Sequence, residues 1–312
     1  MGNSISTATK VYPKKPLIER LRIRKGLMVM LAIGMLWYLI FEYYPMIKVY
    51  WAFTNKGQVP PSKVSFVGLA NFVKLFSRAQ FRRALFNTFY ISFLKIVAGF
   101  PVPIVFALLL NEMRISGVKR SIQTIIYIPH FLSWVVVGAI WYIVLSPADS
   151  PNAQLAQFLG IKPVYWWASD RYIRGLLVAT GIWRNAGYGT IIYLASIMAI
   201  DPNLYEAALM DGANRWQQTW YITLAGIRSV IVILLIIRLG KVLNLFRQVF
   251  VLTTPIVMEP SDVLMTYAYR TGIQQMQVGY AMGVSLFKAA VGLTLVLISN
   301  WLAKKIKEEG VF

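Results

Sequence analysis

The stretch DPNLYEAALMDGANRWQQTWYITL, residues 201–224, decides how the rest of the chain is interpreted. It lies between two long apolar runs, at 175–200 and 222–239. Apolar runs of about this length are typical of membrane-spanning helices. The sequence therefore predicts that this polar stretch lies at one membrane surface.

A short helix is predicted at the start of the stretch, over residues 201–213. Asp201 is suited to cap a helix N-terminus and Pro202 to occupy its first position. Gly212 is suited to end or bend the helix. The side chains between them are small or acidic, notably Glu206 and Asp211. Such a small acidic helix at a membrane surface has a shape suited to docking another protein.

Three short motifs follow one another at a distinctive spacing. Glu206-Ala207-Ala208 is followed after three residues by Gly212, and after nine more by Ile222-Thr223-Leu224. This spacing resembles the EAA loop of ABC-importer permeases. Glu-Ala-Ala alone also fits an ordinary interfacial helix, but the glycine, the Ile-x-Leu and the two flanking spans favour the resemblance. The family pattern closes with proline where this chain has Ala225, so the sequence does not fix how sharply the following span bends.

The resemblance implies a coupling helix that sits in a groove of a cytoplasmic ATPase. The residues predicted to transmit ATPase motion are Glu206, Ala207, Ala208, Asp211, Gly212, Ile222 and Leu224. Other phrases resemble the oligosaccharide branch of these permeases, in the same order along the chain: FEYYPM (41–46), FVGLANF (66–72), ALLLNE (107–112), YIPHFLSW (127–134), WRNAGY (183–188) and NWLAKK (300–305). The resemblance covers residue 27 to the C-terminus.

Fold and partners follow from this resemblance as expectations. It implies the type I ABC-importer permease fold, a second permease subunit that is similar or identical, two ATP-binding subunits and an extracytoplasmic substrate-binding protein. ATP and Mg are expected on the partner ATPases, with no cofactor in this chain. The chain itself is expected to be a transport subunit and not an enzyme.

Composition alone indicates a polytopic membrane protein. The chain of 312 residues is 57% hydrophobic, with a mean hydropathy of +0.57, values outside the range of ordinary water-soluble domains. An all-α fold with about six spans is predicted, at 26–53, 84–110, 122–145, 175–200, 222–252 and 279–303. Residues 1–25 are predicted to be a basic tail and 304–312 a short C-terminal tail, flanking a permease domain at 26–303.

The distribution of charge favours membrane anchoring over nucleic-acid binding. The net charge is +20, but the 32 basic residues are spread over loops and span ends, where the positive-inside rule applies. An even number of spans places both termini on one side, and Lys304 and Lys305 favour the cytoplasm. The coupling helix would then be cytoplasmic, in a bacterial inner membrane. The chain has no cysteine and one histidine, which excludes disulfides and multi-histidine metal sites.

Acidic residues are scarce in the predicted spans, where only Glu42 lies inside an apolar stretch. Proton-coupled transporters and intramembrane proteases need carboxylates that titrate within the membrane. The chain also lacks a G-x-x-x-x-G-K-[ST] phosphate loop. Two alternatives stay open at this stage: a secondary sugar transporter, and a membrane-bound enzyme acting on lipid-linked sugars.

Basic and aromatic residues within the spans are candidates for a translocation cavity: Trp183, Arg184, Asn185, Tyr188, Arg238, Lys241 and Arg247. A charged side chain costs about 2.5–3.5 kcal/mol at a bilayer centre on insertion scales, so it should face water or another subunit. Helical spacing places Arg184 with Tyr188 and Arg238 with Lys241. Asn185 and Tyr188 would bind sugar hydroxyls and Trp183 would stack on rings. Alternatively, these cations reach the interface or pair with the partner permease, the interpretation favoured for Lys95 and Lys288.

Extra positive charge in the fifth span points to an acidic substrate. Relatives of this branch tend to have an acid where this chain has Arg247, and a small residue where it has Lys241. An acidic oligosaccharide, such as the uronate polymer alginate, would be concentrated by this charge; an acid of the partner subunit would also satisfy it. Two further segments, 165–174 with Trp166 and Trp167 and 253–277, are predicted to be external, the first anchored by its aromatics at headgroup depth.

Overall fold

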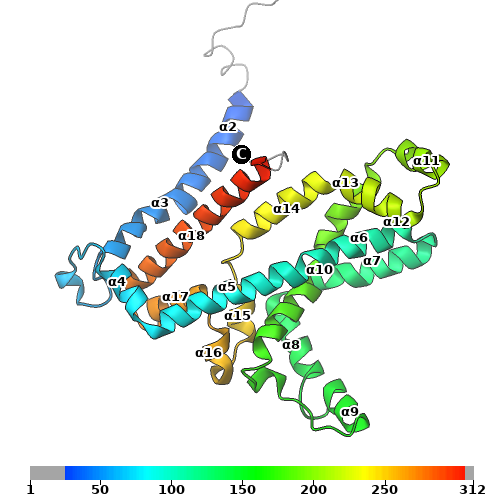
Figure 1. The fold of residues 1–312 in the computed structure, drawn as a ribbon. Coiled ribbons are helices and arrows are strands. Elements are labelled where there is room, and N and C mark those ends of the chain that lie inside the picture. The colour runs from blue at the N-terminus through cyan, green and yellow to red at the C-terminus, as the bar shows by residue number, and fades with distance from the viewer. Residues whose placement is uncertain (1–24, 306–312) are drawn as a thin grey trace, which may run out of the picture. The chain divides into compact units, whose positions relative to one another are not determined.

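The computed structural model describes residues 25–305 (Figure 1). The predicted tails at 1–25 and 304–312 therefore fall almost wholly outside the described residues. The described part of the chain is helical, and its extended pairing is limited to isolated bridges such as Thr54 with Phe66. The predicted all-α class is confirmed.

The chain divides into two compact units, one ending at Tyr50 and one beginning at Trp51. In the first unit, α2 (Lys25–Tyr38) continues through a π-helical turn (Leu39–Tyr43) into α3 (Tyr44–Met46). None of the residues of α2 is buried. An apolar helix with all its faces exposed is what lipid or another subunit would cover.

The second unit contains the remaining helices, which pack around α10 (Ile173–Met198). Helix α10 contacts α5, α6 and α7, whereas α14 packs against α18 and α17 packs against both α5 and α18. The bounds are α4 (Ala70–Ser77), α5 (Ala79–Gly99), α6 (Pro101–Glu112), α7 (Ser116–Phe131), α8 (Trp134–Val144), α9 (Pro151–Phe158), α11 (Pro202–Met210), α12 (Arg215–Gln218), α13 (Leu224–Gly226), α14 (Arg228–Gly240), α15 (Phe246–Leu252), α16 (Met258–Ser261), α17 (Leu264–Tyr269) and α18 (Val278–Lys305).

Three helical stretches of the described chain are long and apolar enough to cross a membrane, Lys25–Phe53, Ala79–Glu112 and Val278–Leu302. Two bent pairs raise the number to five if each is one span. The remaining predicted span, at 175–200, corresponds to α10. It has 26 residues but carries Arg184 and Asn185 at its middle, which lowers its hydropathy. Because 12 of these 26 residues are buried against other parts of the protein, protein contacts replace lipid over much of the α10 surface.

The span predicted at 122–145 is not one straight helix. Helix α7 ends at Phe131, and Ser133 caps α8 by accepting a hydrogen bond from the Val136 amide at 3.3 Å. The two helices meet at 111°. Pro129 in the last turn of α7 and the cap are local signals for this break, which outweigh the continuous apolar pattern.

The span predicted at 222–252 is also interrupted. Its first part bends by 58° between Gly226 and Arg228, so the bend forms without the proline that the family has where this chain has Ala225. The helix then ends at Gly240, and α15 begins only at Phe246. A Cβ on Gly226 would lie 2.8 Å from Ile200 Cδ1, so this glycine lets the bent helix approach the end of α10.

The two segments predicted to be external are folded into the body of the second unit. Trp167 is only 8% exposed and packs in a core cluster with Ile91 and Val257, and Trp166 donates from Nε1 to Asn152 Oδ1 at 2.9 Å. Trp167 is therefore held in the protein core, and the prediction that it anchors the chain at headgroup depth does not hold for this residue. Trp166 is half-buried and hydrogen-bonded, whereas the Nε1 atom of Trp167 is buried without a hydrogen-bond partner among the described residues.

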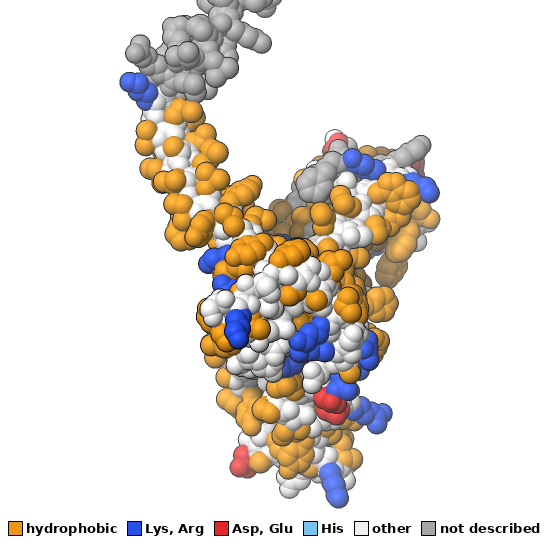
Figure 2. Space-filling view, turned by 90° about the vertical axis from the view of Figure 1, so that its left-hand side faces the viewer, with side chains coloured by type: hydrophobic (Ala, Val, Ile, Leu, Met, Phe, Trp, Pro, Cys, Tyr) orange, Lys and Arg blue, Asp and Glu red, His pale blue; other side chains and the backbone are white. Residues whose placement is uncertain are grey.

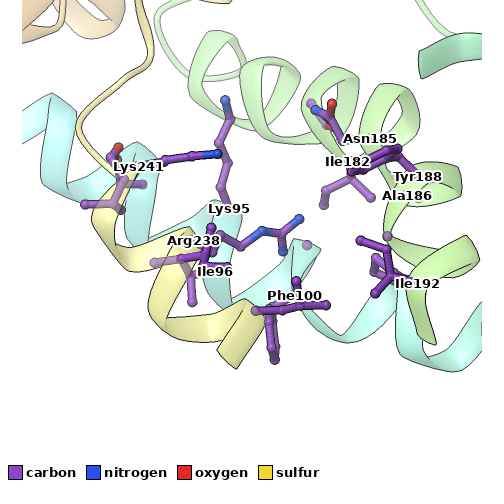
Figure 3. A pocket seen from close by; sticks show the side chains of 18 of the residues that line it. Lys95, Ile96, Phe100, Ile182, Asn185, Ala186, Tyr188, Ile192, Arg238 and Lys241 are labelled. Carbon is purple, nitrogen blue, oxygen red and sulfur yellow. Dashed lines mark hydrogen bonds between the residues drawn. The ribbon is translucent and has the colours of Figure 1, made fainter. Parts of the chain in front are cut away.

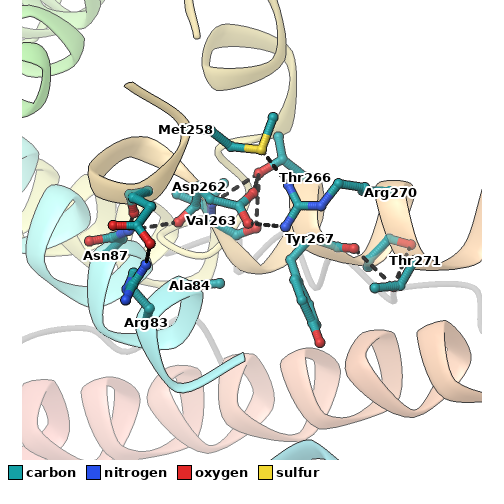
Figure 4. Close-up of polar contacts among 12 residues, drawn as sticks. Arg83, Ala84, Asn87, Met258, Asp262, Val263, Thr266, Tyr267, Arg270 and Thr271 are labelled. Carbon is teal, nitrogen blue, oxygen red and sulfur yellow. Dashed lines mark hydrogen bonds and ion pairs between the residues drawn. The ribbon is translucent and has the colours of Figure 1, made fainter. Parts of the chain in front are cut away.

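Segment 253–277 likewise forms α16 and α17 and is attached to α5 by polar contacts (Figure 4). The Asn87 side chain donates to the carbonyls of Glu259 and Asp262 at 2.9 and 3.0 Å. The Leu264 amide donates to Thr88 Oγ1 at 2.9 Å. These buried bonds hold the segment as a fixed wall of the unit and not as a free loop.

Much of the surface is apolar. On the face shown in Figure 2, hydrophobic side chains cover wide areas, and Lys and Arg side chains occur at several places, whereas acidic side chains are few. Exposed apolar patches of this extent are typical of surfaces covered by lipid or by other subunits.

Candidate functional site: a basic cavity and an exposed helix

A cavity of about 400 Å³ opens between α5, α10 and α14 (Figure 3). Its wall on α5 follows one helical face, with Ser92, Lys95 and Gly99 at spacings of three and four. Helix α10 contributes the opposite wall, and the last turns of α14 close the third side. We call this space the basic cavity.

Three cationic side chains line the basic cavity: Lys95, Arg238 and Lys241. Among the described residues that line it there is no Asp or Glu. The Lys95 ammonium group hydrogen-bonds the Gln248 side-chain oxygen. Arg238 lies over the Phe100 ring, with its guanidinium carbon 5.6 Å from the ring centroid. The charges are therefore held by an amide and an aromatic face, and no carboxylate of the lining neutralises them.

The Arg238 guanidinium also has an unused donor. Its Nη1 atom is buried and finds no hydrogen-bond partner within the part of the chain that the structure describes. A buried donor of this kind costs free energy unless something accepts from it. Cations in a wall of low polarity attract anions more strongly than cations in water do. The basic cavity can thus bind an anionic group.

Two of the predicted sugar-binding residues line the same cavity. Tyr188 stacks on His130, with ring centroids 4.6 Å apart. Asn185 donates to the Gly181 carbonyl at 2.8 Å and accepts from Arg184 at 3.2 Å. Asn185 is therefore held in one orientation by its own helix. Its second amide hydrogen and the Tyr188 hydroxyl are suited to hydrogen-bond hydroxyl groups.

Three predicted cavity residues, Trp183, Arg184 and Arg247, do not line the basic cavity. Arg184 instead donates twice to the Leu132 carbonyl, from Nε at 3.1 Å and Nη2 at 2.9 Å. Its guanidinium also lies 4.9 Å from the Trp134 ring centroid. Arg184 therefore fixes the break between α7 and α8, and the predicted shared face of Arg184 and Tyr188 does not converge on the cavity.

The other two residues lie outside the cavity for different reasons. Trp183 packs edge to face on Trp141, with ring centroids 5.7 Å apart. Arg247 is exposed on α15, the helix that begins only after the break at 241–245. The tertiary structure thus unites Asn185, Tyr188, Arg238 and Lys241 and leaves these two apart.

Sequence reasoning missed Lys95 as a cavity residue. The sequence favoured a Lys95 side chain that reaches the membrane interface or pairs with the partner permease, whereas the structure places it in the cavity lining. Its signal was present in the spacing: Ser92, Lys95 and Gly99 are the polar or small residues of one face in the C-terminal half of α5, at 89–99, where the remaining residues are apolar or aromatic. Lys288, for which the same interpretation was favoured, donates to Asn244 Oδ1 at 2.7 Å and does not line the basic cavity.

The predicted helix at 201–213 forms α11, and its ends have the predicted chemistry. Asp201 Oδ1 accepts from the Asn203 amide at 3.0 Å. At the other end Gly212 has a φ of 77°, and the amides of Gly212 and Ala213 donate to the carbonyls of Leu209 and Ala208 at 3.1 and 2.8 Å. This is the Schellman arrangement, which favours glycine.

The predicted coupling residues fall into two groups. Glu206, Ala207, Asp211 and Gly212 are exposed and Ala208 half-buried, and no residue of α11 is buried. Ile222 and Leu224 are half-buried, and Leu224 packs against the cluster that contains Leu110 of α6 and Tyr193 of α10. The first group thus lies on the open surface of the helix, whereas Leu224 of the second packs into the body of the helices.

Polar contacts join α11 to the segment that follows it, and α12 to α6. The Tyr205 and Thr223 hydroxyls hydrogen-bond at 2.9 Å. Arg215 of α12 forms an ion pair with Glu112, at the end of α6, with N···O 2.6 Å. A displacement of α11 would therefore be passed through η5 (Thr219–Thr223) and α13 to α6 and α10, which both contribute to the cavity wall.

Comparison with known proteins accounts for this combination of features. Residues 99–308 match the family described as "Binding-protein-dependent transport system inner membrane component". The chain belongs to this family. This description names the inner membrane component of a transport system, in agreement with the apolar helices.

Individual relatives cover nearly the whole permease. It is 42% identical over 305 residues to the polygalacturonan/rhamnogalacturonan transport system permease protein YteP of Bacillus subtilis, covering 97% of this chain and 95% of that protein. It is 39% identical to protein LplB of the same organism, over 92% of this chain and 91% of LplB.

A solved structure agrees with the fold. The permease superposes with a TM-score of 0.87 and 38% identity on a chain of a bacterial alginate ABC transporter in complex with an alginate pentasaccharide-bound periplasmic protein, covering 95% of this chain and 99% of that one. The prediction of an ABC-importer permease subunit of the oligosaccharide branch, with the type I permease fold, is therefore confirmed.

Proposed function

We propose that this permease carries acidic oligosaccharides, such as oligomers of galacturonate or alginate, through the basic cavity. The observation that carries the proposal is the set of three cations, Lys95, Arg238 and Lys241, in a lining without a carboxylate. Uronate units each bear one negative charge, so the cavity complements their carboxylates. Asn185 and Tyr188 add hydrogen-bonding groups for hydroxyls.

The relatives support an acidic substrate. One is a permease for polygalacturonan and rhamnogalacturonan, and a related structure is described as importing "the acidic polysaccharide alginate". Both names refer to polymers that contain uronic acids. Their similarity to this chain over most of its length supports the substrate class, and the basic lining supplies a physical reason for it.

Transport is driven, in this proposal, by partner ATPases that bind ATP and Mg, two of them per complex with a second permease subunit. Their motion reaches Glu206, Ala207 and Ala208 on the exposed surface of α11. It is transmitted through the Tyr205 contact and Leu224 to α6 and α10, whose movement alternately opens the basic cavity to either side. Both termini and α11 lie in the cytoplasm, and an extracytoplasmic protein delivers the substrate.

ATP hydrolysis by the complete transporter in liposomes, together with uptake, tests the proposal. Tetragalacturonate and the neutral maltotetraose serve as probes, each with the binding protein present. Tetragalacturonate should stimulate hydrolysis and be taken up, whereas maltotetraose should do neither. Arg238→Gln and Lys241→Gln should lower tetragalacturonate uptake about tenfold, the cost of one charge-assisted hydrogen bond. Lys162→Gln, an exposed lysine outside the cavity, is the control.

Coupling is tested in the same assay by Glu206→Ala, with the exposed Asp170→Ala as the matched loss of a carboxylate. Glu206→Ala should abolish substrate stimulation and Asp170→Ala should leave it unchanged. Stimulation by maltotetraose alone would overturn the acidic substrate, and normal coupling in Glu206→Ala would overturn the role of α11. Uptake by this chain without an ATPase would instead establish a secondary transporter.

A further inference from the structure

A second, smaller cavity of about 170 Å³ lies along α15 and the segment that follows it. It shares no lining residue with the basic cavity. Its walls come from α15, from the turn at Thr253–Pro255 and from α16, α17 and the π-helical turn η7 (Arg270–Gln274). Nothing in the coupling mechanism uses this cavity.

One wall of the second cavity is aromatic. Phe250 and Tyr269 line it, with ring centroids 5.1 Å apart at 75°. Phe246 packs behind both, at 5.1 Å from Phe250 and 5.5 Å from Tyr269. The Phe250 side chain remains 48% exposed. The trio therefore forms a supported aromatic surface, of the kind on which the apolar face of a ring packs.

The opposite wall is polar but electrically balanced. Arg270 Nη2 and Asp262 Oδ2 form an ion pair at 2.5 Å, and the Thr266 hydroxyl donates to Asp262 Oδ1 at 2.7 Å (Figure 4). The Asp262 side chain is 10% exposed and the Arg270 side chain 23%. Because the two charges neutralise each other, this wall favours hydroxyl groups over a free carboxylate.

An orphaned hydroxyl points to a ligand here. Thr253 lines the cavity, and its Oγ1 is buried without a hydrogen-bond partner among the described residues. Buried hydroxyls are normally paired, since leaving one unpaired costs free energy. Gln274, which also lines the cavity and is exposed, adds a side-chain amide. An aromatic wall, a hydroxyl and an amide are the groups that bind a sugar ring.

We propose that the second cavity is a sugar subsite that holds one ring of the oligosaccharide by its hydroxyls and its apolar face, while the basic cavity holds carboxylates. The proposal rests on the proposed function and deepens it, because it divides substrate recognition between two chemistries. Helix α15 separates the two cavities: Gln248 supports Lys95 on one side, and Phe250 forms the aromatic wall on the other.

Saturation-transfer NMR on the complete transporter in nanodiscs, without the binding protein, tests this division. The two probes are tetragalacturonate and its carboxyl-reduced form, which keeps every ring and hydroxyl but has no carboxylate. Tyr269→Leu and Thr253→Val should weaken binding of both probes by the same factor, about three- to tenfold, the range for an aromatic contact or one hydrogen bond. Thr253→Ser keeps the hydroxyl and should bind like the original protein.

Arg238→Gln provides the contrast, because it should weaken tetragalacturonate alone. Tyr165→Leu, an exposed tyrosine outside both cavities, is the matched control, and unchanged thermal unfolding checks that each variant is folded. If Tyr269→Leu and Thr253→Val bind both probes as tightly as the original protein does, the sugar subsite is overturned. The acidic substrate remains supported in that case if Arg238→Gln weakens the binding of tetragalacturonate. Loss of tetragalacturonate alone in the Thr253 and Tyr269 variants would also overturn the sugar subsite. Absence of binding of either probe to the original protein would overturn both proposals.

Discussion

At the scale of single residues, identical side chains acquire different roles from what surrounds them. Arg184 and Arg238 are both arginines in apolar helices, and both were candidates for the translocation cavity. Arg184 donates two hydrogen bonds, from Nε and Nη2, to the Leu132 carbonyl. Arg238 keeps a buried Nη1 without a partner among the described residues and lines the basic cavity. A guanidinium that the protein satisfies is structural, whereas one left unsatisfied is available to a ligand.

Gly187 should be the glycine of α10 that is least tolerant of substitution. A Cβ there would lie 2.2 Å from the Ile126 carbonyl oxygen, whereas a Cβ on Gly175 of the same helix meets nothing within 4 Å. Because the obstacle is backbone, Gly187→Ala should separate α10 from α7 and destabilise the protein by about 1–3 kcal/mol. Thermal unfolding in detergent measures this, with Gly175→Ala as control. Equal midpoints for the two variants would show that α7 and α10 do not pack this closely.

At the scale of elements, two of the predicted spans are broken, and each break is held by a specific contact. The break between α7 and α8 is held by Arg184, and the bend before α14 is held by the close approach of Gly226 to Ile200. Apolar content alone does not reveal such breaks, because the sequence on both sides remains apolar. Caps and glycines do reveal them, and Ser133 and Gly226 are the local signs.

Arg184→Gln should loosen the break between α7 and α8. The substitution removes two hydrogen bonds from a charged donor to the Leu132 carbonyl, which we expect to lower stability by about 1.5–3 kcal/mol. Arg184→Lys keeps the charge but not the forked geometry and should recover only part of the loss. The rate of amide hydrogen exchange at residues 131–136 measures how far the break between α7 and α8 is loosened. Unchanged protection in Arg184→Gln would mean that the break is held without this side chain.

Gly212 should accept asparagine but not valine. Its φ of 77° is favourable for glycine, accessible to asparagine and strained for a β-branched residue, even though a Cβ there meets nothing within 4 Å. Gly212→Val should cost about 1–2 kcal/mol and fray the end of α11, with faster hydrogen exchange at residues 211–213. Gly212→Asn is the control that separates backbone strain from side-chain bulk. If both variants exchange alike, the positive φ does not limit this position.

At the scale of the whole molecule, the predicted orientation of the chain in the membrane can be tested by labelling introduced cysteines. The chain contains no cysteine of its own, so each label reports a single position. Single cysteines placed at Asn203, Lys304 and Lys63, all exposed, should react with a membrane-impermeant maleimide from different sides. We expect Asn203→Cys and Lys304→Cys to be labelled only in inverted vesicles, and Lys63→Cys in intact spheroplasts. Labelling of Asn203→Cys from outside would contradict the placement of α11 on the ATPase side.

The sequence by itself determined the class, the family and the position of the short helix α11. These depend on local patterns: apolar length, a cap at Asp201, a left-handed glycine at Gly212 and the spacing between them. Each pattern is read within a few turns of chain, so no long-range contact was needed. The pairing of Arg238 with Lys241 was accessible for the same reason, as three residues separate them on one helix.

Only the tertiary structure decided which cations share the cavity, that Trp167 is buried, and that 253–277 forms a wall with a cavity of its own. Lys95 meets Arg238 across two helices far apart in sequence, and Arg184 turns to a carbonyl exposed by a break that apolar periodicity conceals. Helical spacing places a side chain on a face. What that face contacts depends on the bends between helices. Contacts between distant segments set those bends, and such contacts cannot be predicted from a local sequence pattern.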